Sequence, residues 1–209
     1  HRPYHSPRRS EQAAQTRRDV IAAAGELFTA SGWSGATVAA VADRAGVAVE
    51  TVYKAVGSKK ELLRAAMDAA VVGDAEPVPF AERPEFRALS EGRLDERLAK
   101  AAVLNRQIQE RSAGVWQAVV QAASADDTVD AWRLDWERGR RVDLRRGLSE
   151  VLGAPPDEQI VTLLWLLYGP ETYLKLVNDQ GLDSNAYEQF LIDVTRRLAV
   201  PPRRRGRAG

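Results

Sequence analysis

The sequence has no cysteine, and its two histidines, His1 and His5, both lie at the N-terminal end. Without cysteine, the chain has no disulfide and no thiolate that could serve as a metal ligand or a nucleophile. The body of the chain also lacks the imidazole that a catalytic triad or a histidine-ligated zinc site uses. We therefore expect no metal, no cofactor and no enzymatic activity.

Long apolar runs are missing too. The longest candidate, residues 163–168, is much shorter than the ~20 residues that a membrane-spanning helix needs. The N-terminal residues contain proline and arginine where a signal peptide has an apolar stretch. The sequence predicts a cytoplasmic protein that has no contact with a membrane.

Positive charge is concentrated near the N-terminus. Residues 1–64 carry ten Lys/Arg and six Asp/Glu, whereas residues 65–200 carry sixteen Lys/Arg and twenty-three Asp/Glu. Residues 201–209 add four arginines. A basic N-terminal part on an acidic body indicates that only one end of the chain meets a polyanion.

Apolar residues recur at helical spacing along the whole chain, and no stretch shows the sustained alternation of a β-strand. Hydrophobic residues make up 44% of the sequence, which is enough for a packed core. The pattern predicts an all-α fold. Two short helices near the N-terminus come before a longer helical part that proline pairs and glycines interrupt.

The segment TVAAVADRAGVAVETVY, residues 37–53, has the pattern of a helix-turn-helix. Thr37 stands at the N-cap of the first helix. Ala42 and Ala45 are small where the two helices would cross, and Gly46 can adopt the positive φ that the turn requires. The second helix, about residues 48–56, would then enter the major groove of DNA.

With its neighbours, this segment resembles the TetR family of transcriptional repressors. The stretch RRDVIAAAGELFTASGW is similar to the first helix of the family, and GSKKELL is similar to the start of the fourth. The resemblance covers roughly residues 16–67, and a looser one begins at LLYGPETYLKLVNDQ. It implies a three-helix DNA-binding domain followed by a larger helical domain for ligand binding and dimerisation. We predict a flexible basic arm over 1–15, the DNA-binding domain over 16–57, the effector-binding and dimerisation domain over 58–200, and a disordered basic tail over 201–209.

The resemblance also implies which residues contact DNA. Thr37 and Tyr53 match residues that contact the DNA backbone, and Lys59 matches a lysine that meets a phosphate at a helix N-terminus. The exposed face of the second helix offers candidates for reading bases. The predicted DNA-binding set is Thr37, Val49, Glu50, Thr51, Tyr53, Lys54 and Lys59.

This chain departs from the family pattern in two places. Ala48 stands where the family usually has Ser or Thr, so the recognition helix lacks its side-chain cap. Ala55 and Val56 replace the residues that often follow the tyrosine, which changes the packing between the third and fourth helices. Glu50 is unfavourable near phosphates unless its carboxylate accepts a hydrogen bond from cytosine N4.

Aromatic residues in the C-terminal body could line a pocket for a small hydrophobic or aromatic effector, although aromatics at helical spacing more often belong to a core. The candidates are Asn105, Trp116, Trp132, Trp136 and Tyr168. Trp132 and Trp136 are one turn apart and share a face. Asn105 lies on an apolar stripe, where it either hydrogen-bonds within the core or faces a cavity.

The expected partners are double-stranded operator DNA and a second copy of the chain. Two further hypotheses stay open. One is a constitutive DNA-binding regulator whose core is filled and binds no effector. The other is a helical enzyme or adaptor that retains the N-terminal head, and the lack of histidine and cysteine argues against the enzyme.

Overall fold

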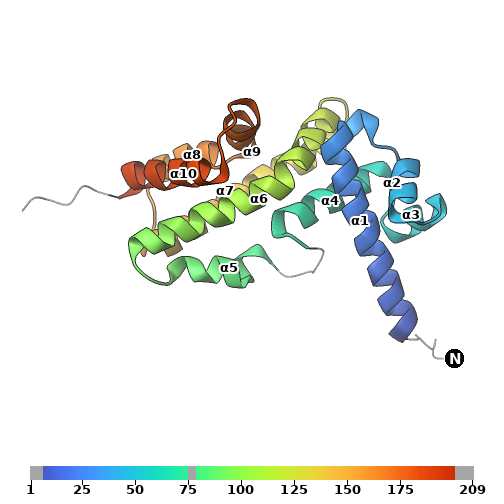
Figure 1. Cartoon of the computed structure of the whole chain (residues 1–209), viewed down its shortest axis with the longest axis horizontal. Helices are drawn as coiled ribbons and strands as arrows, with labels where there is room; N and C mark the ends of the chain where they lie inside the picture. Colours follow the sequence, from blue (N-terminus) through green and yellow to red (C-terminus); the bar gives the residue numbers. More distant parts are fainter. Residues whose placement is uncertain (1–6, 75–78, 201–209) are drawn as a thin grey trace, which may run out of the picture. The chain divides into compact units, whose positions relative to one another are not determined.

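A computed structural model of the chain describes residues 7–74 and 79–200. Throughout these two ranges the regular structure is helical and no strand occurs, which confirms the predicted all-α fold (Figure 1). No helix in the described part of the chain is both long enough and apolar enough to cross a membrane. The helices are α1 Pro7–Gly35, α2 Val38–Ala45, α3 Val49–Ala55, α4 Lys59–Val72, α5 Pro84–Arg87, α6 Leu94–Ala123, α7 Asp127–Leu152, α8 Glu158–Leu167, α9 Pro170–Tyr173 and α10 Ser184–Ala199, with 3₁₀ turns η1 Phe80–Glu82 and η2 Ala88–Ser90 and a π-helical segment η3 Leu174–Asp179.

Helix α1 begins at Pro7, well before residue 16, where the apolar periodicity starts. Every described side chain up to Gln15 is exposed, so this part of the helix has no buried stripe from which it could be predicted. Residues 7–15 of the predicted flexible arm therefore lie in a helix. Residues 1–6 of that arm, and the predicted tail over 201–209, lie outside the described residues.

The chain divides into two compact units, and both are built from separated segments. The first unit contains His1–Pro77 and Glu110–Trp136, and the second contains Val78–Gln109 and Glu137–Gly209. Helices α6 and α7 each run from one unit into the other. This division differs from the predicted boundary at residue 57, because the middle of the chain packs onto the N-terminal helices.

The core of the first unit joins helices α1–α4 to parts of α6 and α7. Val20 and Phe28 of α1 are almost completely buried, as are Val115 and Val119 of α6. Val129 of α7 is buried in the same cluster. Burying side chains of this size stabilises a fold by about 1.5–3 kcal/mol each, so the α6 and α7 segments contribute to the stability of the N-terminal helices.

In the second unit, helices α8 and α10 lie side by side (Figure 1). Helix α8 ends at Leu167 and α9 begins at Pro170, which has no N–H and is favoured in the first turn of a helix. The break is one of the interruptions by glycine and proline that the sequence predicts in the longer helical part. It leaves carbonyl groups at the end of α8 that need other hydrogen-bond donors.

Candidate nucleic-acid interface

Helices α2 and α3 form the predicted helix-turn-helix. The hydroxyl of Thr37 accepts a hydrogen bond from the backbone N–H of Ala40 at 3.1 Å, which caps α2. Gly46 adopts φ 66° and ψ 34°, the left-handed conformation that closes the turn. Its N–H bonds back to the carbonyl of Asp43 at 3.2 Å. These local contacts set the direction in which α3 leaves the turn.

One face of α3 is buried and the opposite face is open. Val52 is completely buried, and Val49 is half-buried against the same core. Glu50, Tyr53 and Lys54 are exposed, and Tyr53 is 54% exposed. Two of the predicted contacts, Val49 and Thr51, are thus partly covered by the protein. The side chains available to a groove of DNA are those of Glu50, Tyr53 and Lys54.

Both ends of α3 have simple physical explanations. Ala48 has the extended backbone of an N-cap residue and makes no side-chain cap bond, as the sequence predicted. At the other end, the Arg17 guanidinium of α1 donates to the carbonyl of Ala55 at 2.6 Å. A cation bonded to the last carbonyls of a helix also stabilises its dipole. Arg17 could not be predicted from the sequence, because an arginine on an exposed helix face gives no distinctive pattern.

Lys59, the residue predicted to contact a phosphate, lies at the start of α4. The carboxylate of Glu61 accepts from the backbone N–H of Ser58 at 2.6 Å in a capping box at the same helix end. This hydrogen bond lowers the pKa of Glu61. Lys59 is the first residue of α4, and its ammonium lies 4.3 Å from the ring centre of Trp33. Partial burial lowers the pKa of Lys59.

The residues predicted to bind an effector fall into two groups. Asn105 and Tyr168 meet in the second unit, where the Asn105 amide donates to the Tyr168 carbonyl at 3.1 Å and accepts from the Tyr187 hydroxyl at 3.0 Å. The amide of Gln109 donates to the same carbonyl at 2.8 Å. Of the two alternatives for Asn105, the structure has the hydrogen bond within the core. The bonds from Asn105 and Gln109 satisfy a carbonyl at the end of α8.

The three tryptophans belong to the first unit instead. Trp116 is 4% exposed in its core, and Trp132 packs against that core with the Arg64 guanidinium 5.0 Å from its ring centre. The indole N–H of Trp136 donates to the carboxylate of Asp68 at 2.7 Å. Trp132 and Trp136 both connect α7 to α4, and the structure does not bring the five candidates together in one unit.

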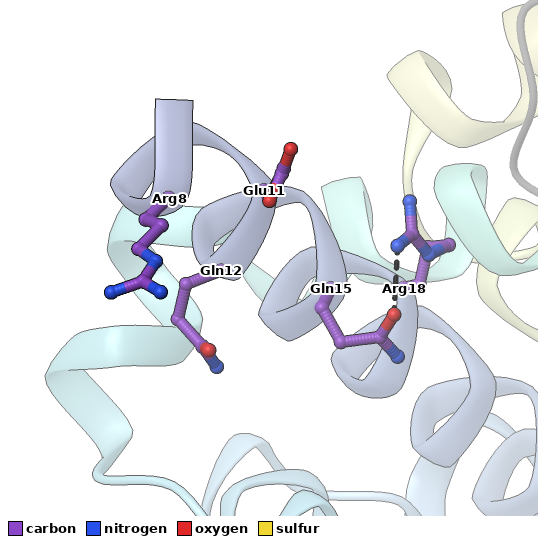
Figure 2. Close-up of a pocket in the computed structure, with 5 residues that line it drawn as sticks. All are labelled: Arg8, Glu11, Gln12, Gln15 and Arg18. Atoms are coloured by element: carbon purple, nitrogen blue, oxygen red, sulfur yellow. Dashed lines mark hydrogen bonds between the residues drawn. The ribbon is translucent and has the colours of Figure 1, made fainter. Parts of the chain in front are cut away.

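A shallow polar pocket lies along the N-terminal part of α1 (Figure 2). All of its lining side chains come from this one exposed helix, and Arg18 donates to Gln15 at 2.7 Å across it. Such a hollow is open to solvent and differs from the apolar, enclosed pockets that hold small effectors. The lining residues are Arg8, Glu11, Gln12, Gln15 and Arg18. Among the described residues, no group of three or more acidic or histidine side chains could hold a metal ion.

Residues 20–66 match the family model described as bacterial regulatory proteins, tetR family. No curated protein matches the chain. Solved structures of other proteins share its fold, among them two regulators. A protein described as a TetR-family transcriptional regulator from Mesorhizobium loti MAFF303099 is 17% identical, with a TM-score of 0.64 over 89% of this chain and 96% of that chain. A transcriptional regulator from Rhodococcus sp. Rha1 is 21% identical, with a TM-score of 0.62 over 88% of this chain and 99% of the other.

Proposed function

We propose that this chain, whose residues 20–66 match the model for bacterial regulatory proteins of the tetR family, is a cytoplasmic, non-enzymatic repressor of that family that binds operator DNA as a homodimer. A small hydrophobic or aromatic molecule that binds the helical part over residues 58–200 releases it from the operator. The observation that carries the proposal is the open face of α3. Tyr53 and Lys54 are exposed there, while Val52 holds the opposite face in the core.

The DNA contact has two parts. Tyr53, Lys59 and the cap of α2 at Thr37 bind phosphates and fix the register of the protein on the duplex. Glu50 and Lys54 read base edges in the major groove, where a carboxylate accepts from cytosine N4 and an ammonium donates to guanine O6 and N7. Thr51 and Val49 are partly covered and supply smaller contacts at the edge of this surface.

Dimerisation uses helices α8 and α10 of each copy, packed as a four-helix interface. Leu163 and Leu166 of α8 support this arrangement, because these residues are 45% and 55% exposed. Exposed leucines one turn apart form an apolar stripe that a second copy would remove from water. The two copies then present their recognition helices to half-sites about one helical turn apart.

Release by an effector requires that the effector bind one conformation of the protein more tightly than the other. Asn105 and Tyr168 are our candidate contacts in the second unit, with Trp116, Trp132 and Trp136 as candidates on the α6 and α7 segments of the first. A constitutive regulator without effector is the alternative. It is favoured by the hydrogen bonds that already satisfy Asn105 and the Tyr168 carbonyl within the protein.

The test is the selection of bound sequences from a random duplex pool. We expect the full chain to recover one palindromic motif, and we expect the double variant Tyr53→Ala, Lys59→Ala to recover none. Lys175→Ala removes an exposed lysine from the second unit and serves as the control that keeps the motif. Failure of the unmodified chain to enrich any motif at moderate salt would overturn the proposal. Retention of the recovered duplex in the presence of every small aromatic compound tested would favour the constitutive alternative.

A further inference from the structure

Lys59 and Lys60 are adjacent at the start of α4, but their charges are held in different ways. The Lys60 ammonium lies 2.9 Å from the carboxylate of Asp126, so its charge is paired. The Lys59 ammonium lies instead over the ring of Trp33, 4.3 Å from the ring centre. An aromatic face attracts a cation through its quadrupole and carries no net charge of its own. Lys59 is therefore held in one position while its positive charge stays available to an anion.

The ring below Lys59 is itself anchored. Trp33 stacks on Phe28, with ring centres 6.1 Å apart and planes 15° from parallel. Phe28 is 1% exposed, at the centre of the core of the first unit. The indole therefore cannot turn away from Lys59 without disturbing a buried aromatic contact.

The backbone of Trp33 is fixed from a third helix. The side-chain amide of Gln121, on α6, accepts a hydrogen bond from the Trp33 N–H at 2.9 Å. This approach depends on Gly32, which adopts φ 64° and interrupts the regular helix. A Cβ atom at Gly32 would lie 2.6 Å from the Gln121 amide oxygen, too close for any other residue without a shift. Gln121, Trp33 and Lys59 thus form a continuous set of contacts within the first unit.

We propose that Trp33 is a positioning residue for DNA binding: it holds the Lys59 ammonium at the N-terminus of α4, where a DNA phosphate is bound, and Gln121 fixes Trp33 in place. The inference rests on the proposed DNA-binding function. A phosphate at this point would meet the ammonium together with backbone N–H groups at the start of α4 outside the capping box. A lysine already held there loses less side-chain freedom on binding than a free one.

The experiment is a double-mutant cycle on the affinity for the duplex recovered from the pool, measured over a range of salt concentrations. We expect Trp33→Leu to weaken binding by about three-fold, the scale of one cation–π contact at a partly exposed site. In the Lys59→Ala background the same substitution should have almost no effect, because the lysine that it positions is gone. Lys59→Ala should also lower the salt slope by about 0.9, the value for one phosphate contact.

Three further variants separate positioning from general damage to the fold. Trp33→Phe keeps an aromatic face and should restore part of the affinity. Gln121→Ala should weaken binding less than Trp33→Leu, and only while Trp33 and Lys59 are both present. Trp132→Leu is the matched control, since it removes a tryptophan from beneath the cation of Arg64 in the same unit. Its effect should be the same with or without Lys59.

A measurement without DNA tests the contact itself. The methylene protons next to the Lys59 ammonium should resonate upfield in the NMR spectrum because of the indole ring current, and Trp33→Leu should remove this shift while leaving Lys60 unchanged. Absence of the shift in the unmodified chain overturns the inference, as does equal weakening by Trp33→Leu with and without Lys59. If the unmodified chain binds no duplex at all, the proposed function is overturned. If the chain binds DNA and the effects of Trp33→Leu and Lys59→Ala are additive, only the positioning role of Trp33 is overturned.

Discussion

The hydroxyl of Tyr168 lies 2.7 Å from the hydroxyl of Thr195, and both side chains are buried in the second unit. Neither group can turn to water, so each depends on the other. We expect Thr195→Val to lower the free energy of unfolding by about 1–3 kcal/mol, because it leaves the Tyr168 hydroxyl without a partner. In urea unfolding, the double variant Thr195→Val, Tyr168→Phe should have a free energy of unfolding closer to that of the unmodified chain than Thr195→Val alone has. Equal or greater loss in the double variant would contradict this account.

The same burial predicts a loss of stability at alkaline pH. Burial raises the pKa of Tyr168 from 10.0 to about 12, and burial also raises the pKa of Tyr187. Both groups keep their protons more tightly in the folded chain than in the unfolded chain. Their contribution to stability is therefore complete below pH 10 and is lost as the pH rises towards 12. Unfolding followed by far-UV circular dichroism should coincide with the appearance of tyrosinate absorbance, and Tyr168→Phe should move the transition to higher pH.

Gly46 gives a sharp test of the turn. Its φ is +66°, and an added Cβ would meet nothing within 4 Å, so the cost of a side chain there is conformational only. We expect Gly46→Ala to destabilise the chain by about 1–2 kcal/mol, and Gly46→Asn to cost less. Gly139 also has open space around it, but no positive φ is found there and it lies inside α7. Gly139→Ala should therefore stabilise the chain by about 0.8–1 kcal/mol in the same thermal unfolding measurement.

A substitution at Ala48 can supply the side-chain cap that the start of α3 lacks. Ala48 has φ −72° and ψ 153°, a conformation in which a serine hydroxyl can accept from the N–H groups of the first turn. Ala48→Ser should increase the free energy of unfolding by about 0.5–1 kcal/mol. Ala30→Ser, at an exposed position within α1, should give no increase. A loss of stability for Ala48→Ser would show that the N–H groups of the first turn of α3 already have other hydrogen-bond partners.

Glu50 should oppose non-specific binding to DNA. It is exposed in the first turn of α3, where its charge repels phosphates. We expect Glu50→Gln to tighten binding to an unrelated duplex at low salt by about two- to five-fold, and to weaken discrimination at any base pair that Glu50 reads. Asp127→Asn makes the same change of charge at an exposed position of α7 and should change affinity much less. Equal effects of the two variants would mean that only net charge matters.

The helix-turn-helix could be predicted from the sequence because its determinants are local. Thr37 caps the helix that follows it, and Gly46 closes its own turn, so each residue specifies its surroundings without help from distant parts of the chain. The capping box of Ser58 and Glu61 is equally local. These contacts span three or four residues and leave a recognisable spacing.

The other determinants of the site are long-range and could not be read from spacing. Arg17 contacts Ala55, and Gln121 contacts Trp33, across large separations in sequence and from exposed positions that show no pattern. Val115 and Val119 form an apolar stripe at helical spacing. Periodicity identifies a buried face but does not say which element covers it. The packing of this stripe against α1 could therefore not be predicted.

The first unit is assembled from two stretches of chain that are not contiguous, and this constrains how its helix-turn-helix head can be inherited. A single crossover or gene fusion after residue 77 would carry α1–α4 into a new protein without Val115, Val119 and Val129, whose side chains complete the core of the head. The recipient would have to supply an equivalent helical hairpin. Shuffling of proteins built in this way is therefore expected to conserve the head together with the middle of the chain, while the segments that belong only to the second unit diverge.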